Sequence, residues 1–137
     1  MKVLFDSNVY ISWIREYKHK DIMLSPYTQK YLSSIVLMEL WAGCKTKKSI
    51  RLIENLQGPY LKTKRIVTPS VKNYILAGQI ISDLPVNYKN KKKDSSFIND
   101  IIIAVTAFST GSILYTENES DFKIINKYLK GMKIKYL

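Results

Sequence analysis

Short apolar runs alternate with longer segments along the chain, and the short runs predict strands. The first run, KVLF at residues 2–5, is continuously apolar after its lysine, which is typical of a strand buried in a parallel sheet. The last run, MKIKYL at residues 132–137, alternates and places Lys133 and Lys135 on one face, as in a charged edge strand. The predicted strands are residues 2–5, 30–34, 65–69, 112–116 and 132–137.

The longer segments between these runs carry apolar residues at helical spacing and predict helices. Ser34 is the expected N-cap of the second helix, and Ser95 or Ser96 is the expected N-cap of the fifth. Gly58 and Pro59 are expected to end the third helix. The predicted helices are residues 9–14, 35–43, 47–56, 70–84 and 97–108, followed by a short helix within residues 117–129.

Two polar segments interrupt this order without dividing the chain. Residues 15–29 contain Pro26 and predict a loop or a short irregular helix, and residues 86–96 carry KNKKKD and predict a loop. No linker, repeat or low-complexity tract is present in the sequence. We therefore predict one α/β domain over residues 1–137, with a central, mostly parallel five-stranded sheet and helices on both faces.

A carboxylate stands inside the most apolar predicted helix, FINDIIIAVTAF at residues 97–108. Asp100 shares a helical stripe with Phe97, Ile103 and Ala107, and the opposite side of the helix is also apolar. A buried carboxylate is costly unless a cation or a hydrogen-bond donor meets it. Asp100 is therefore either a lone acid satisfied by local donors or part of a larger acidic site.

Three other acids stand where surface acids are uncommon. Asp6 closes the first predicted strand, Asp121 follows the fourth, and Glu39 lies within the apolar segment IVLMELWAG. Ligand sites of open α/β sheets lie beyond the carboxyl ends of the strands, so these acids and Asp100 are expected to converge on one edge. Carboxylates without His or Cys suit a hard cation, Mg²⁺ or Mn²⁺, although a lysine can also serve as the counter-charge.

Each acid also has a purely structural interpretation. Asp6 can act as a helix N-cap, Glu39 can pair with a nearby lysine, and Asp121 can cap the last helix. The aromatic residues near the predicted site have a similar alternative, because packing is a commoner role for them than base stacking. This group comprises Tyr10, Trp13, Trp41 and Tyr115.

Composition and charge narrow the class of protein. Hydrophobic residues make up 46% and charged residues 24% of the chain, as in a globular domain, and the formal net charge is +11. A surface with this excess of positive charge attracts polyanions. However, 19 of the 22 basic residues are lysines, and a high lysine content is equally typical of AT-rich coding sequences. The start MKVLFD has no signal-peptide pattern and no apolar run spans a membrane, so we expect a cytoplasmic protein.

The sequence lacks the motifs of several common enzyme classes. The single cysteine, Cys44, excludes an internal disulfide and a cysteine-based zinc site, and no phosphate-binding loop or dinucleotide fingerprint is present. An aspartyl-phosphate phosphatase would need an acid where this chain has Asn8, and a signalling receiver domain would need one at the end of the third strand. His19, the only histidine, stands in a polar segment and is expected to be solvated.

Four stretches in order along nearly the whole chain resemble PIN-domain ribonucleases, and more narrowly the VapC-like toxins of toxin–antitoxin pairs. They are LFDSNVYI, SSIVLMELWAG, INDIIIAVTA and LYTENESDF. By this resemblance, the four acids of the family's site fall on Asp6, Glu39, Asp100 and Asp121. The polar residues that orient such acids fall on Ser7, Asn8, Thr116 and Asn118. Glu117 and Glu119 are expected to be solvated.

The resemblance implies Mg²⁺-dependent or Mn²⁺-dependent hydrolysis of RNA, a small antitoxin partner and a homodimer. The lysine-rich segment at 89–93 precedes the Asp100 helix, and we expect it to contact the RNA backbone. Its basic residues are Lys89, Lys91, Lys92 and Lys93. The alternative is a non-catalytic RNA-binding or protein-interaction module that retains the fold and binds RNA independently of metal.

Overall fold

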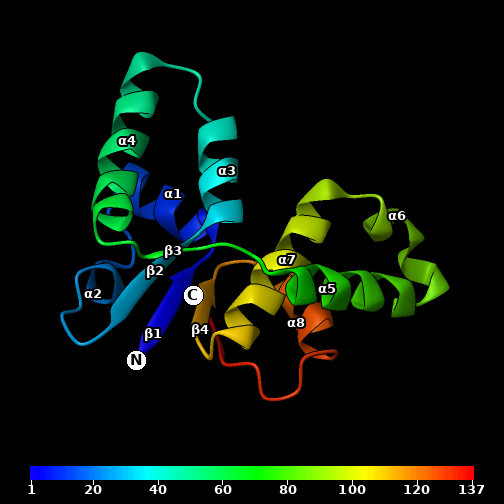
Figure 1. Cartoon of the computed structure of the whole chain (residues 1–137). Coiled ribbons are helices and arrows are strands. Elements are labelled where there is room, and N and C mark those ends of the chain that lie inside the picture. Colours follow the sequence, from blue (N-terminus) through cyan, green and yellow to red (C-terminus); the bar gives the residue numbers. More distant parts are fainter.

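Five parallel strands form one sheet in the order β3-β2-β1-β4-β5 in the computed structural model, which describes all residues 1–137 (Figure 1). Every neighbouring pair is parallel, and Leu4 on the central strand lies in register with Tyr31 on one side and Leu114 on the other. The strands are β1 (Lys2–Phe5), β2 (Gln29–Ser33), β3 (Ile66–Val67), β4 (Ile113–Thr116) and β5 (Ile134–Tyr136). The predicted five-stranded parallel sheet is confirmed.

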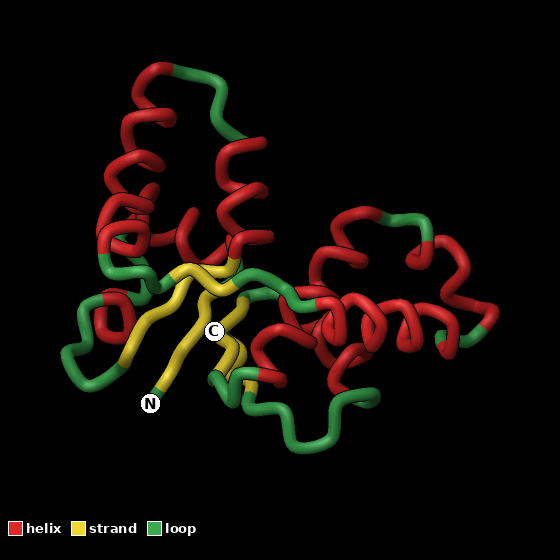
Figure 2. The backbone as a smooth tube through the Cα atoms, viewed as in Figure 1, coloured by secondary structure: helices red, strands yellow, loops and turns green.

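The helices form two groups, and the backbone trace shows the sheet between them (Figure 2). In one group α3 contacts α1 and α4, and in the other α7 contacts α5, α6 and α8. The first four helices are α1 (Ser7–Glu16), α2 (Lys20–Met23), α3 (Ser34–Ala42) and α4 (Lys47–Lys62). A 3₁₀ turn at Val86–Tyr88 accompanies the other four, α5 (Val71–Asp83), α6 (Lys89–Lys92), α7 (Ser95–Ser109) and α8 (Glu119–Asn126).

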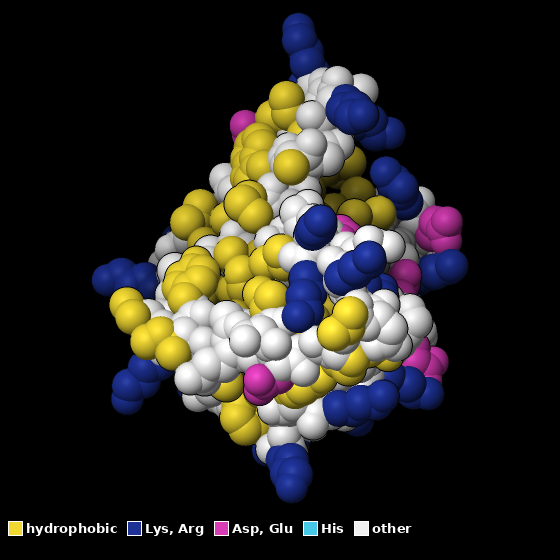
Figure 3. Space-filling model, turned by 90° about the vertical axis from the view of Figure 1, so that its right-hand side faces the viewer, with side chains coloured by type: hydrophobic (Ala, Val, Ile, Leu, Met, Phe, Trp, Pro, Cys, Tyr) yellow, Lys and Arg dark blue, Asp and Glu magenta, His cyan; other side chains and the backbone are white.

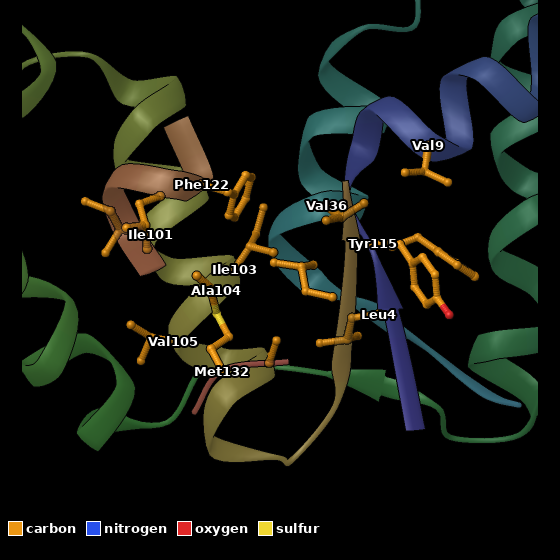
Figure 4. Packing of buried hydrophobic residues seen from close by; sticks show 14 of the residues in the cluster. Leu4, Val9, Val36, Ile101, Ile103, Ala104, Val105, Tyr115, Phe122 and Met132 are labelled. Carbon is orange, nitrogen blue, oxygen red and sulfur yellow. The ribbon is translucent and has the colours of Figure 1, made fainter. Parts of the chain in front are cut away.

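Apolar side chains cover both faces of the neighbouring strands β1 and β4. Figure 4 shows Ile103 and Phe122 on one side of the strands and Val9 and Tyr115 on the other. The α7 helix is buried over most of its length, as its all-round apolar sequence predicts. Each large side chain buried in this way contributes about 1.5–3 kcal/mol. The helix that carries Asp100 is therefore held firmly against the sheet.

The order of the strands determines where a ligand site can form. The chain runs from β1 outward through β2 to β3, then returns and places β4 on the opposite side of β1. The carboxyl ends of β1 and β4 therefore meet at a reversal of strand order, which is the usual ligand position in open α/β sheets. Asp6 directly follows β1, and Thr116 is the last residue of β4.

The third helix is longer than its sequence predicts, because α4 continues through Gly58 and Pro59 to Lys62. The prediction that Gly58 and Pro59 end this helix is wrong. Proline inside a helix costs about 3 kcal/mol. Here the extra turn places Tyr60 against the core, where its hydroxyl lies 3.0 Å from that of the buried Tyr10. Packing of this residue outweighs the local penalty.

Several predicted boundaries also shift by a few residues. The N-cap of α3 is Ser33 instead of Ser34, and the N-cap of α7 is Asp94, whose Oδ1 accepts from the Ser96 N–H at 2.9 Å. The segment 86–96, predicted as a loop, contains the 3₁₀ turn and α6. None of the helices combines the length and apolar character that crossing a membrane requires.

Candidate active site

Asp6 lies at the carboxyl end of β1 and is 3% exposed. Its backbone N–H donates to the Tyr115 carbonyl, and its Oδ1 accepts from the Ser7 N–H at 2.8 Å, so Asp6 caps α1. Its Oδ2 accepts from the Thr116 hydroxyl at 2.8 Å and from the Asn8 amide at 3.1 Å. Burial raises the pKa of Asp6, and these hydrogen bonds oppose the rise.

A polar network joins the ends of β1 and β4. Asn8 donates to Asp6 through Nδ2 and accepts the Glu117 N–H through Oδ1 at 3.2 Å. The hydroxyl of the fully buried Thr116 accepts the Asn118 N–H at 3.0 Å. This network fixes the orientation of the Asp6 carboxylate and places Asn8, Thr116 and Asn118 beside the acids.

Asn118 connects two of the acids. It caps α8, with its Oδ1 accepting the Asp121 N–H, and its Nδ2 donates to Asp100 Oδ2 at 3.1 Å and to Asp121 Oδ2 at 3.2 Å. One amide group therefore holds a carboxylate of α7 beside a carboxylate of α8. The structural interpretation of Asp121 as the helix cap is wrong, because Asn118 takes that role.

Asp100 is 5% exposed and has like-charged neighbours. Burial raises its pKa to about 8, with further contributions from the negative charges of Asp6, Glu39 and Asp121, while the Asn118 hydrogen bond lowers it. Charges act on one another in this way only over short distances in a poorly solvated site. The other three acids that the sequence singles out therefore act together on the charge of Asp100.

Glu39 projects from α3 and is half-buried, and its Oε1 atom is buried without a hydrogen-bond partner. Burial raises the pKa of Glu39, as does the charge of Asp6, while the side chains of Asn99 and Ser7 lower it. A buried oxygen without a donor is uncommon in folded proteins and indicates a place for a cation or an ordered water. Asn99, the neighbour of Asp100, was not predicted from the sequence to belong to the site.

Asp121 is the acid that carries an internal counter-charge. Its Oδ1 lies 2.7 Å from the Lys91 ammonium, whereas Asp6, Glu39 and Asp100 form no ion pair with Lys or Arg. The interpretation of Glu39 as the partner of a lysine is therefore wrong. The charges of Asp6, Glu39 and Asp100 are therefore not balanced by any lysine or arginine. The Oε1 atom of Glu39 also lacks a hydrogen-bond donor.

The donor set suits a hard cation, although the side chains are not gathered into a finished metal site. No group of three or more Asp, Glu, His or Cys side chains lies close enough together to hold one ion. A bound cation would give the unpartnered oxygen of Glu39 a partner and would relieve the mutual repulsion at Asp100. The residues therefore fit Mg²⁺ or Mn²⁺ in chemistry, with side-chain adjustment needed on binding.

Two expectations about charged side chains near the site are wrong, and one is confirmed. His19 is half-buried instead of solvated, and its Nε2 pairs with Glu117, a second residue expected in solvent. The pair forms because α2 places His19 beside the end of β4, which the sequence alone does not indicate. Glu119 is exposed as expected and pairs with Lys123 one turn along α8.

The lysine-rich segment divides into two kinds of side chain. Lys91 points to Asp121, whereas Lys89, Lys92 and Lys93 form no ion pair. Figure 3 views the molecule from the right-hand side of Figure 1 and shows Lys and Arg side chains spread widely over that face, with fewer acids. On this face, the positive charge is therefore spread broadly and is not confined to one stripe.

A scan of the sequence against models of protein families identifies the family of this chain. The model of the PIN domain matches residues 3–128. The chain belongs to the PIN-domain family. The match includes all four acids and the polar residues that hold them. It thus extends over both halves of the sheet and the whole candidate site of this PIN domain.

Comparisons with individual proteins are consistent with membership of this family. The PIN domain is 30% identical over 130 residues to a protein named Ribonuclease VapC1 from Rickettsia felis, covering 91% of each chain. The fold of the PIN domain resembles that of one chain in the crystal structure of VapBC2 from Rickettsia felis bound to a promoter DNA fragment, with a TM-score of 0.68 and 21% identity. The match covers 100% of the PIN-domain chain and 99% of the other. FitAcB from Neisseria gonorrhoeae gives a TM-score of 0.68 at 23% identity, covering 98% and 96%.

Proposed function

We propose that this PIN domain is a metal-dependent endoribonuclease and the toxin of a toxin–antitoxin pair. The observation that carries the proposal is Asp100, a buried acid whose pKa is raised to about 8 by burial and by the charges of Asp6, Glu39 and Asp121. A fold does not need such a repulsive group for its stability, so the group is best explained by a reaction that uses it. The 30% identity to Ribonuclease VapC1 supports RNA as the substrate.

Mg²⁺, or Mn²⁺ in its place, would be held by Asp6, Glu39, Asp100 and Asp121. When bound, the ion would neutralise charge that develops on the phosphate and would lower the pKa of a water molecule, so that the water can release a proton to solvent and attack phosphorus. The chain supplies the oxygen ligands for this role. Glu39 Oε1 has no competing hydrogen bond, so it is available to a cation without loss of an existing contact.

The polar residues have the role of orienting these acids. Thr116 and Asn8 both donate to Asp6 Oδ2, so Asp6 keeps one rotamer, and Ser7 holds the other oxygen through its N–H. Asn118 keeps Asp100 and Asp121 within reach of one amide. Because these donors already hold Asp6, its carboxylate loses less conformational entropy than a free side chain would when it binds an ion, which strengthens binding.

We further propose that exposed lysines beside the site bind the RNA backbone. Lys89 and Lys93 are exposed and unpaired on the segment that leads into α7, and Lys92 is half-buried and unpaired. Ammonium groups bind phosphates without reading sequence, so these residues would contribute affinity and not specificity.

The proposed partners follow from the relatives. The similar solved structures include VapBC complexes from Rickettsia felis and Haemophilus influenzae, the latter with a TM-score of 0.64. By analogy we propose a cognate antitoxin protein that blocks the acidic site, and a homodimer of this chain. Co-expression with the antitoxin should restore the growth of cells in which this chain alone is toxic.

The deciding experiment is cleavage of total RNA by the purified chain in Mg²⁺, in Mn²⁺ and in EDTA. We expect cleavage that EDTA abolishes and that the Asp100→Asn variant lacks. Glu119→Gln is the matched control, because Glu119 is an exposed acid near the same site that pairs only with Lys123.

Two outcomes would contradict the proposal. Cleavage that persists in Asp100→Asn would assign the activity to a contaminant. RNA binding that ignores EDTA, without cleavage, would favour a non-catalytic RNA-binding module instead.

A further inference from the structure

Lys91 is the one basic residue whose ammonium enters the acidic cluster. Its Nζ lies 2.7 Å from Asp121 Oδ1, and no other Lys or Arg forms an ion pair with any of the four acids. Lys91 belongs to the short helix α6, in the segment that connects α5 to α7 (Figure 1). Asp121 belongs to α8, so this contact joins two segments 30 residues apart.

The structure holds the Lys91 side chain in this position from two sides. Its ammonium lies 5.0 Å from the centre of the Phe97 ring, which attracts a cation through its π face. Phe97 is fully buried on the first turn of α7, so the ring is a fixed support. The nearby charges of Asp121, Asp94 and Asp100 all favour the charged form of the lysine.

Both oxygens of Asp121 already have partners. Its Oδ1 accepts from Lys91, and its Oδ2 accepts from Asn118. A metal ion that binds Asp121 through Oδ1 therefore competes with the Lys91 ammonium, because two cations a few ångströms apart repel each other strongly. The other acids carry no such cation, and Glu39 even has an unpartnered oxygen.

We propose that Lys91 is a built-in cation that neutralises the Asp121 side of the cluster in the metal-free chain and competes there with the metal ion. This inference rests on the proposed metal-dependent function. When Mg²⁺ binds, the ammonium leaves Asp121. The lysine thus weakens binding of the ion at Asp121 more than at the far side of the cluster.

The first test measures Mg²⁺ binding to the metal-free chain by calorimetry. Lys91→Met removes the charge and keeps an apolar side chain over the Phe97 ring, and it should lower the Mg²⁺ Kd about fivefold, the factor that corresponds to one part-exposed ion pair. Lys93→Met is the matched control, since Lys93 lies on the same segment without an ion pair, and it should change the Kd less than about twofold.

The conservative variant Lys91→Arg separates charge from packing. Because arginine keeps the positive charge, its Mg²⁺ Kd should stay near that of the unmodified chain. An unchanged or weaker affinity in Lys91→Met would overturn the inference. So would an equal gain in affinity in Lys91→Met and Lys93→Met, because a general surface-charge effect would then explain the result.

The second test uses the unmodified chain and does not depend on the folding of a variant. Acetylation of lysine amines, followed by mass spectrometry, reports how accessible each ammonium is. We expect Lys91 to react several-fold faster in Mg²⁺ than in EDTA, while Lys93 serves as the internal control with an unchanged rate. Equal rates for Lys91 in the two conditions would contradict displacement by the ion.

These experiments distinguish failure of the inference from failure of the proposed function. If the unmodified chain binds no Mg²⁺ and cuts no RNA, both fall together. If it binds Mg²⁺ and cuts RNA but Lys91→Met behaves like the unmodified chain, only the role of Lys91 falls.

Discussion

At the scale of the residue, Asp100 shows how burial and charge act together. The side chain is nearly inaccessible, and three acids lie near enough to raise its pKa further. Asn118 provides its one direct hydrogen bond. Ionisation of this buried side chain destabilises the folded, metal-free chain. The loss of stability can be measured without an assay of RNA cleavage.

We predict that the metal-free chain loses stability as the pH rises from about 4 to about 8. The pKa of Asp100 is about 8 in the folded chain against an ordinary value of 3.8, so between these values the folded chain holds a proton that the unfolded chain releases. Stability falls with rising pH wherever the unfolded state binds fewer protons. Thermal unfolding in EDTA across this range measures the effect.

The Asp100→Asn variant provides the comparison for this pH dependence. An amide cannot ionise, so in EDTA at pH 8 the variant should melt several degrees higher than the unmodified chain and show a flatter pH profile. Parallel pH profiles for the two chains would show that Asp100 ionises normally.

We predict that Asn118→Ala lowers RNA cleavage about 10-fold to 100-fold, the usual range for a residue that orients metal ligands. The substitution removes the donor that bridges Asp100 and Asp121. It should also weaken Mg²⁺ binding, which calorimetry measures directly. Ser120→Ala is the control, because Ser120 is exposed and its hydroxyl forms one hydrogen bond, to Asn118 Oδ1. Equal losses in both variants would point to a general effect on α8.

At the scale of the element, α6 and α7 bring both positive and negative side chains to the site. The α6 helix carries Lys89, Lys91 and Lys92, and α7 begins at the next capped turn, with Asp94 as its N-cap. The α7 helix then places Asp100 one and a half turns further in. Within this segment, Lys91 pairs with Asp121, whereas the other lysines remain available to a polyanion.

We predict that alanine at Lys89, Lys92 and Lys93 together flattens the salt dependence of RNA binding. Each phosphate contact to a single strand contributes a slope of about −0.7 in log K against log salt, so three lost contacts should reduce the slope by about 2. Filter binding at several salt concentrations with Asp100→Asn as background avoids cleavage of the probe.

A control variant removes the same number of lysines elsewhere. Lys127, Lys130 and Lys133 are exposed and lie between α8 and β5, toward the amino end of β5. Alanine at these three positions should leave most of the slope unchanged. An equal reduction in both triple variants would mean that RNA responds to net charge alone.

At the scale of the whole molecule, the reversal of strand order is what assembles the site. Asp6 and Thr116 are 110 residues apart in sequence, yet they hydrogen-bond because β1 and β4 are neighbours in the sheet. Glu39 and Asp100 come from helices that contact each other, α3 and α7. No single segment contains enough of the site to function alone.

We predict that the purified chain is a homodimer. Light scattering coupled to size exclusion should give a mass near twice the 15.9 kDa of the chain, without change over a range of micromolar concentrations. A mass of one chain at all concentrations would contradict the homodimer, while leaving the nuclease proposal intact.

Local features of the fold were predictable because they depend on neighbouring residues. The apolar run of β1, the all-round apolar pattern of α7 and the position of Asp6 after a strand are each encoded within a few residues. The end of α4 was not predictable in this way. Its continuation through Pro59 depends on the contact of Tyr60 with Tyr10, 50 residues away.

The sequence by itself determined the parallel α/β fold, because periodicity and strand ends are local properties. It also singled out four acids as candidates, because they stand at positions where surface acids are rare. Only the tertiary structure decided which polar group meets each acid. Lys91 meets Asp121, and His19 meets Glu117, because helix packing brings distant segments together. Such pairs depend on three-dimensional distances that no spacing along the chain expresses.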